Sequence, residues 1–425
     1  MEGIYSLLFF QPWSGCGMDK GKIIKFYRQK AKLTQEQLGY GICSNTHVSK
    51  IEQGKTDYSS EITSLFSKRL GINIEEELMR YKNIKRLLHS WHDAMIRQRD
   101  EEIETIKNEL EKEPLITLSD YQVLYELLNA RYHLLHQEFK QADKIIKAIN
   151  KKHKHLPPYE RNLLKHLSGM YYLSKKDVLK AFATLGTINV DDYNNEEYYL
   201  TLATSYLATG SKVMAYYYAE KSLRYFINSN NLLKMIDAEM IMLMTRESDG
   251  YSDFQQKVEQ YDALIQTCNL CHAFEKKARV LHNLAYEYYN RNEYESAKRL
   301  YEQSMCLKEK KSTCYLTSLE GFIWSCHKGN LLAINELENL VLEGISIARE
   351  LNEYLSSINF KLLHLLLNNQ QAEYYNYLIT NALPYFKKRG YVSLVQQYEK
   401  ELFHYYMKTD ETNKALELAT KVFSD

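Results

Sequence analysis

The sequence has few of the residues that interrupt regular secondary structure, with only 5 prolines and 16 glycines among 425 residues. This composition disfavours a turn-rich β protein and favours long helices. No stretch has the length and apolar purity of a membrane span, so no membrane partner is expected. The chain is too long for one compact core and predicts two or three domains or an extended array.

Disulfides and cofactor motifs are also lacking. Seven cysteines without a regular framework indicate reduced thiols in the cytoplasm. The string Cys268-Asn-Leu-Cys271-His272 matches the c-type haem attachment pattern, but haem attachment requires export and no signal peptide precedes it. Its occurrence is therefore ascribed to chance. Because no metal motif, phosphate loop or catalytic triad is recognisable, we expect no cofactor, no metal and no catalytic machinery.

Residues 1–17 lack the basic start and long apolar core of a signal peptide. We interpret them as an over-called start preceding Met18 or as a disordered arm. The net charge is only +1, but residues 18–75 carry ten Lys and Arg against six Asp and Glu. A basic head on a near-neutral body suits a nucleic-acid contact that is confined to the head.

Residues 33–54 have the pattern of two short helices joined by a tight turn. Thr34 followed by Gln37 forms a capping-box signature, and Ser44 can cap the second helix. Between the helices, Gly41 lies in the predicted turn. The apolar residues recur at spacings that bury one face of each helix, namely Leu33, Leu38, Ile42, Val48 and Ile51. This stretch predicts a helix-turn-helix, and Gly71 is expected to end the bundle that follows.

From about residue 118 onward, helix pairs recur with a period close to 34 residues, which is the period of tetratricopeptide repeats. A small residue late in the first helix is followed twelve residues later by Ala in the second. We align copies on Ala130/Ala142, Gly169/Ala181, Ala203/Ala215, Ala285/Ala297 and Gly321/Ala333. About eight pairs are predicted, forming a right-handed α-solenoid with a concave face. A HEAT-like or irregular solenoid is the alternative.

The string Gly-Ile-Cys-Ser-x-x-x-Val-Ser-Lys-Ile-Glu-x-Gly, followed by these repeats, resembles the RRNPP peptide-pheromone receptors of Gram-positive bacteria, the group of Rgg, NprR and PlcR. The fold class expected is all-α, with an N-terminal helix-turn-helix bundle followed by the tetratricopeptide solenoid. The expected domains are an arm or over-called start, a DNA-binding head, a connector helix and a repeat domain for peptide binding and oligomerisation, over residues 1–17, 18–74, 75–117 and 118–425.

The second helix of the motif has side chains that suit a DNA major groove, since Asn, Thr and Lys can bond base edges or phosphates. By motif position, the resemblance implies that Asn45, Thr46 and His47 contact bases. It assigns phosphates mainly to a second group, Gln35, Ser49 and Lys50. The alternative is a helix-turn-helix that serves only as a dimerisation or protein-contact module.

An extended peptide is the ligand that the concave face would suit. The amide of Asn283 can donate to and accept from a peptide backbone, and the resemblance implies this role. Tyr286 lies on the same face by helical spacing. Repeat register places Arg131, Thr201 and Asn359 there as well, and Arg131 could hold a peptide carboxylate. The alternative is an ordinary solvated surface.

The resemblance implies a cytoplasmic quorum-sensing regulator, a homodimer or tetramer that binds double-stranded DNA and a short signalling peptide. A second hypothesis is a Rap-like protein that binds or dephosphorylates a response regulator, for which residues 75–137, with Gln98, Gln122 and Gln137, could provide the docking surface. A third is a repressor of the same architecture carried by a phage or another mobile element. The sequence does not decide between activation and repression.

Overall fold

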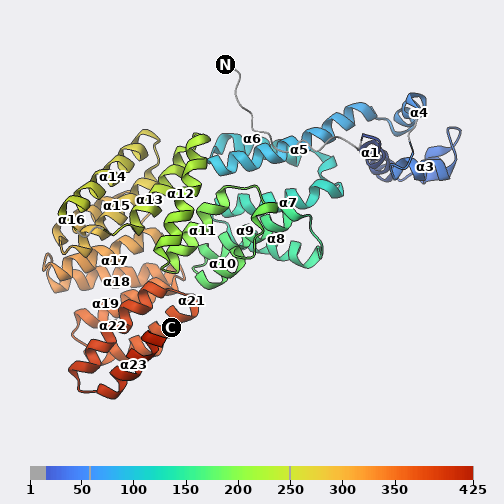
Figure 1. Cartoon of the computed structure of the whole chain (residues 1–425). Coiled ribbons are helices and arrows are strands. Elements are labelled where there is room, and N and C mark those ends of the chain that lie inside the picture. Colours follow the sequence, from blue (N-terminus) through green and yellow to red (C-terminus); the bar gives the residue numbers. More distant parts are fainter. Residues whose placement is uncertain (1–15, 57–58, 248–249, 425) are drawn as a thin grey trace. The chain divides into compact units, whose positions relative to one another are not determined.

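The computed structural model describes residues 16–56, 59–247 and 250–424, and every regular element in these ranges is helical (Figure 1). None of the helices in these ranges is long and apolar enough to cross a membrane. Most of the predicted arm, residues 1–15, lies outside the described residues, and the first helix begins at Cys16. The chain divides into two compact units, Met1–Glu160 and Arg161–Asp425.

The first unit contains the head, two longer helices and the first helix pair of the repeats. Its elements are α1 (Cys16–Lys30), α2 (Gln35–Gly39), α3 (Asn45–Glu52), α4 (Ser60–Leu70), α5 (Ile74–Arg97), α6 (Asp100–Glu111), the 3-10 turn η1 (Pro114–Thr117), α7 (Ser119–Leu135) and α8 (Phe139–Lys152).

Local signals position the two helices of the predicted motif. The capping box is present, because Gln37 N donates to Thr34 Oγ1 at 3.1 Å and Thr34 N donates to the Gln37 side chain at 2.8 Å. Ser44 Oγ accepts from His47 N at 3.2 Å and caps α3. Gly41, with φ +69°, lies in the turn between them. The predicted helix-turn-helix is therefore present.

Each of the helices α1 to α5 contributes at least one apolar residue to the core of the head. Its buried members are Ile24, Leu38, Val48, Ile51, Phe66 and Ile74. Gly71, at φ +67°, ends α4 as predicted.

Residues 75–117, expected to form a single connector helix, instead form α5, α6 and η1. The break occurs at Gln98, which adopts a left-handed conformation with φ +56°, and α6 then packs against α5. Ile103, Ile106 and Leu110 of α6 are buried, as is Trp91 of α5. This stretch is therefore a packed part of the first unit.

The second unit continues the helix pairs. Its elements are α9 (Pro158–Ser174, which starts at the unit boundary), α10 (Val178–Leu185), η2 (Val190–Asp192), α11 (Glu197–Ala208), α12 (Lys212–Asn228), α13 (Leu232–Thr245), α14 (Tyr251–Leu270), α15 (Phe274–Asn290), α16 (Tyr294–Cys306), α17 (Thr313–Lys328), α18 (Ile334–Glu350), α19 (Tyr354–Leu367), α20 (Gln371–Tyr377), the π-helical turn η3 (Leu378–Ala382), α21 (Leu383–Arg389), α22 (Val392–Lys408) and α23 (Thr412–Ser424).

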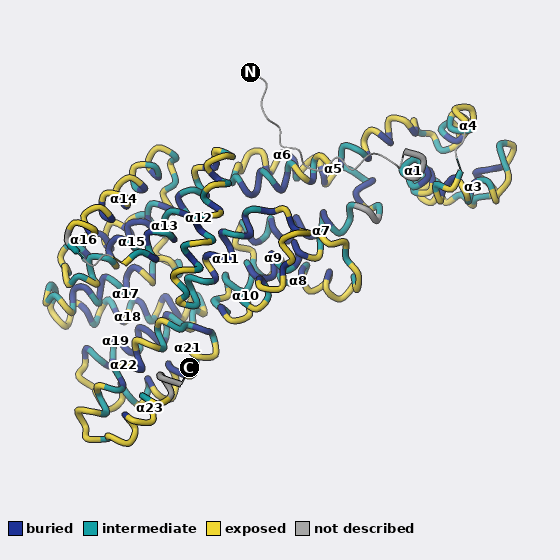
Figure 2. The backbone as a smooth tube through the Cα atoms, viewed as in Figure 1, coloured by how far each residue is buried: buried dark blue, intermediate teal, exposed yellow. Residues whose placement is uncertain are grey.

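Small residues let the paired helices approach closely, as predicted. A Cβ added to Gly169 on α9 would lie 2.4 Å from Leu185 Cδ2 on its partner helix α10. One added to Gly321 on α17 would lie 2.4 Å from Tyr301 Cζ on α16, so this glycine permits close packing against the preceding pair instead. Ala333 differs from the prediction, because it is the exposed N-cap of α18 and Leu337 is buried in its place. Figure 2 shows buried residues along the facing sides of the helices.

Candidate functional site

Helix α3, the predicted recognition helix, turns polar side chains outward and apolar ones inward. Asn45, Thr46 and Lys50 are exposed, whereas Val48 is fully buried. His47 is half-buried, and its Nε2 atom is shielded from solvent, so it offers less to a base than predicted. The face available to a major groove is therefore built chiefly from the exposed residues of the first two turns.

A buried charge pair, which the sequence did not reveal, joins the helices of the head. The guanidinium of Arg28 donates to both carboxylate oxygens of Glu52, from Nε at 2.6 Å and from a terminal nitrogen at 3.0 Å. Gln35 Nε2 donates to the same carboxylate at 2.8 Å. The side chain predicted to reach phosphate is thus held by Glu52. Ser49, half-buried, accepts from Gln53 at 3.2 Å.

Polar contacts also fasten the head to α5 within the first unit. Tyr27 of α1 donates to Glu77 Oε2 at 2.6 Å, and Arg80 donates to Glu77 Oε1 at 2.9 Å. Burial and the hydrogen bond to Glu77 raise the pKa of Tyr27 well above its usual value. Lys20 of α1 pairs with Glu75 of α5. These contacts fix α1 against the helix that leads to the repeats.

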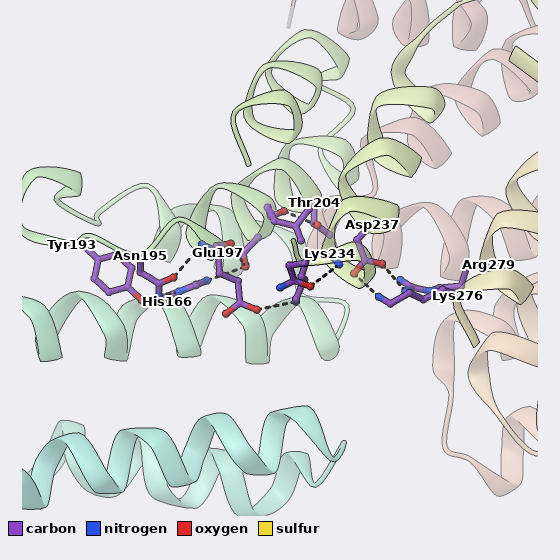
Figure 3. Close-up of polar contacts among 12 residues, drawn as sticks. His166, Tyr193, Asn195, Glu197, Thr204, Lys234, Asp237, Lys276 and Arg279 are labelled. Atoms are coloured by element: carbon purple, nitrogen blue, oxygen red, sulfur yellow. Dashed lines mark hydrogen bonds and ion pairs between the residues drawn. The ribbon is translucent and has the colours of Figure 1, made fainter. Parts of the chain in front are cut away.

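In the second unit, a line of polar contacts joins the first helices of successive pairs (Figure 3). Glu197 of α11 pairs with Lys234 of α13 at 2.8 Å. Asp237 of α13 accepts from Lys276 at 2.7 Å and from Arg279 at 2.8 Å, both on α15. Burial alone would raise the pKa of Asp237, but the neighbouring cations, Lys276 foremost, bring it below its usual value.

The same line begins at a buried histidine. His166 of α9 bonds Tyr193 through Nδ1 at 2.8 Å and Thr201 through Nε2 at 2.9 Å. Thr201, predicted to face a ligand, is only 8% exposed and belongs to this structural contact. Thr204, one turn later on α11, is exposed.

Two of the predicted peptide-binding residues remain accessible on α15. Asn283 is half-buried, and its amide nitrogen lies 3.3 Å from the sulfur of Met244. Tyr286 is 52% exposed and its ring stacks on that of Tyr289 at 6.5 Å. His282, the residue before Asn283, is hydrogen-bonded to Ser318 through Nδ1 at 2.9 Å. An amide beside a ladder of tyrosines can bond a peptide backbone and cover its apolar side chains.

Arg131 and Asn359, the remaining two predicted residues, are buried as Thr201 is. Arg131, on α7 of the first unit, is 2% exposed and has interactions of its own. Asn359, on α19, is 9% exposed and donates to both carboxylate oxygens of Glu320, at 3.1 and 3.0 Å. Glu320 was not singled out from the sequence. The sequence feature that could have pointed to Glu320 is its position on the first helix of a predicted pair.

The haem-like string has a structural explanation. Cys268 is fully buried in the core of the second unit, and burial raises the pKa of its thiol. Cys271 follows the last residue of α14, and His272 lies in the turn before α15. The buried first cysteine is unsuited to thioether formation.

No protein-family model matches the sequence. The transcriptional activator NprA of Geobacillus stearothermophilus is 22% identical over 389 residues, covering 87% of this chain and 93% of its own. The resemblance to the RRNPP receptors is confirmed.

Solved RRNPP structures establish the fold. The quorum sensor NprR in complex with its cognate peptide NprX is 18% identical, with a TM-score of 0.67 over 80% of this chain and 99% of its own. Apo NprR from B. thuringiensis gives a TM-score of 0.58 at 18% identity, and the match covers 81% of this chain and 98% of NprR. A Rap protein complexed with competence and sporulation factor gives a TM-score of 0.69 at 13% identity, and the match covers 81% of this chain and 97% of the Rap protein. The helical repeat architecture predicted from the sequence is thus confirmed.

Proposed function

We propose that the chain is a cytoplasmic transcriptional regulator whose head binds DNA and whose repeats bind a short signalling peptide. The observation that carries the proposal is the exposed polar face of α3, with Asn45, Thr46 and Lys50, on a basic head joined to tetratricopeptide-like repeats. The names of two similar proteins support it, since NprA is a transcriptional activator and NprR is a quorum sensor bound to a peptide.

DNA binding is tested with the purified full chain and fragments from its own gene neighbourhood. Asn45→Ala should cost about 1–3 kcal/mol on the specific fragment and relax specificity at one base, because a bidentate amide–adenine contact is lost. Lys50→Ala should weaken binding to all fragments and lower the salt slope by about 1. Lys68→Ala, an exposed lysine on α4, is the charge-matched control. A folded protein that binds no DNA would overturn this part of the proposal.

Peptide binding is tested with synthetic peptides from small secreted reading frames beside the gene. A peptide should change DNA affinity or oligomeric state only if it prefers one arrangement of the repeats. Asn283→Ala should remove that response, whereas Asn290→Ala, at the exposed end of the same helix, should retain it. DNA binding that is indifferent to every peptide would point to a constitutive repressor.

The likeness in fold to a Rap protein gives a second candidate, binding of a response regulator. Of the glutamines named for this role, Gln122 donates to Glu126 at 3.1 Å, and Gln137 is exposed where α7 ends. The double variant Asn45→Ala/Lys50→Ala separates the two functions, because it should abolish DNA binding and retain capture of a response regulator. A Gln137→Ala variant with unchanged dephosphorylation would remove this residue from the candidate site.

A further inference from the structure

The first helices of four successive pairs in the second unit, α15, α17, α19 and α22, bring acidic and phenolic side chains close together. Burial foremost raises the pKa of Tyr301 and that of Tyr398 on α22, and the charge of Glu320 on α17 adds to both shifts. The α9–α10 turn reaches the same region, because Lys176 pairs with Glu353 at 2.8 Å and accepts a hydrogen bond from Tyr391 at 3.0 Å through its carbonyl.

Two hydrogen-bond acceptors converge at the joint between α17 and α19. The amide nitrogen of Asn359 is used up by Glu320, to which it donates at 3.0 and 3.1 Å. Asn359 is only 9% exposed, and its amide oxygen, Oδ1, is shielded from solvent. This oxygen accepts no hydrogen bond from any residue that the structure describes. A buried acceptor without a donor is destabilising, so a donor group of a ligand would be bound favourably at Oδ1.

The carboxylate of Glu320 is equally short of a counter-charge. Burial raises its pKa to about 7, against the opposing effects of Asn359 and Lys176. Among the described residues, Lys176 is the only cation that contributes to this shift, and its amine is already paired with Glu353. Glu320 forms no ion pair with any Lys, Arg or His in the described part of the chain, whereas Glu197 and Asp237, its counterparts on earlier first helices, are both paired. Glu320 as a residue is only partly exposed to solvent.

We infer that Glu320 and Asn359 Oδ1 form a subsite for a positively charged, hydrogen-bond-donating group of the bound peptide, an ammonium or a guanidinium. Such a group satisfies both acceptors at once and supplies the missing counter-charge. The inference deepens the proposed function and rests on it. The group could be the free N-terminus of the peptide or a Lys or Arg side chain, and the experiment distinguishes the two.

The probe is a synthetic heptapeptide library with free N-termini, passed over the immobilised full chain and read by mass spectrometry, beside an N-acetylated copy of the same library. Recovery from the free library alone identifies the N-terminal ammonium. Recovery from both, with Lys or Arg enriched at one position, identifies a side chain. For a recovered peptide, Glu320→Gln should weaken binding roughly 10- to 100-fold, because one partner of a desolvated charge pair is removed. Glu302→Gln, an exposed glutamate on α16, should leave it unchanged.

Glu320→Gln keeps an oxygen that Asn359 can bond, so the joint is expected to remain folded, and thermal unfolding checks this directly. Peptides recovered equally from both libraries without basic enrichment, and bound equally by Glu320→Gln, would overturn the subsite and leave the receptor function standing. Failure of the wild-type chain to recover any peptide would overturn the receptor function and the subsite with it.

Discussion

The pair between Arg28 and Glu52 provides a quantitative test of how the head holds its recognition helix. Its side chains are 11% and 2% exposed, so solvent screens the pair little. Arg28 also donates to the carbonyl of Leu33 at 2.8 Å, ahead of α2. Arg28→Met would leave Glu52 buried with only Gln35 as a donor. Breaking one side of a buried pair costs about 3–5 kcal/mol.

That loss is large for so small a module. A head of roughly 57 residues has a total stability of about 3–9 kcal/mol by the usual scaling with length. Arg28→Met should therefore remove a large fraction of it and lower DNA affinity without changing the side chains proposed to contact DNA. The double variant Arg28→Met/Glu52→Met should recover most of the loss, because replacing both members of a buried pair by apolar residues is often neutral.

Hydrogen exchange of the α3 amides in the full chain measures this loss where it occurs. Lys25→Met, on an exposed position of α1, should change protection little. If Arg28→Met lowered protection less than about tenfold, which is 1.4 kcal/mol, solvent would be screening the pair. If the double variant lost as much as the single one, the hydrogen bond from Arg28 to the Leu33 carbonyl, and not the charge pair, would be what holds α3.

Three further outcomes follow from the second unit. Gly321→Ala should lower stability by about 1–3 kcal/mol in thermal unfolding, because the added Cβ would meet the buried ring of Tyr301 and the gain in helix propensity is only about 1 kcal/mol. Burial, helped by Lys308, lowers the pKa of His282 to about 3, so the unfolded chain binds the extra proton. Stability should thus fall with a slope of up to about 1.4 kcal/mol per unit as pH drops below 6.5, and His282→Asn should flatten that slope. Because the pKa of Glu320 is raised to about 7, a cationic peptide should lower it and release a proton on binding at pH 6.5, which calorimetry in two buffers would detect and Glu320→Gln would abolish.

Local rules were enough to predict the head. Thr34, Ser44 and Gly71 act within four residues of the helix ends that they define, and the buried faces of α2 and α3 follow the helical period. The Arg28–Glu52 pair was missed because its members are 24 residues apart and neither belongs to a periodic pattern. The hydrogen bond from the Gln35 amide to Glu52 spans 17 residues and was not predictable for the same reason, so the sequence alone suggested phosphate as the partner of Gln35.

In the repeats, the small residues were predictable because close helix packing constrains their spacing. The direction in which an individual side chain points was harder to predict. Thr201 and Asn359 lie on first helices, as predicted, but each bonds a residue on another first helix, 35 and 39 residues away. These separations differ because both the second helices and the loops differ in length, α10 having 8 residues and α18 having 17, so a fixed period cannot identify the partner.

The cross-repeat contacts also bear on how a peptide could act. Each contact joins two first helices, and the pair between Lys176 and Glu353 joins the start of the second unit to its later pairs. A ligand shifts such an assembly only by the difference in its affinity for two arrangements. A peptide held by one helix alone would bind both arrangements equally well. One that reaches from Asn283 on α15 to the joint between Glu320 and Asn359 would contact helices whose spacing the arrangement changes, so binding and curvature would be coupled.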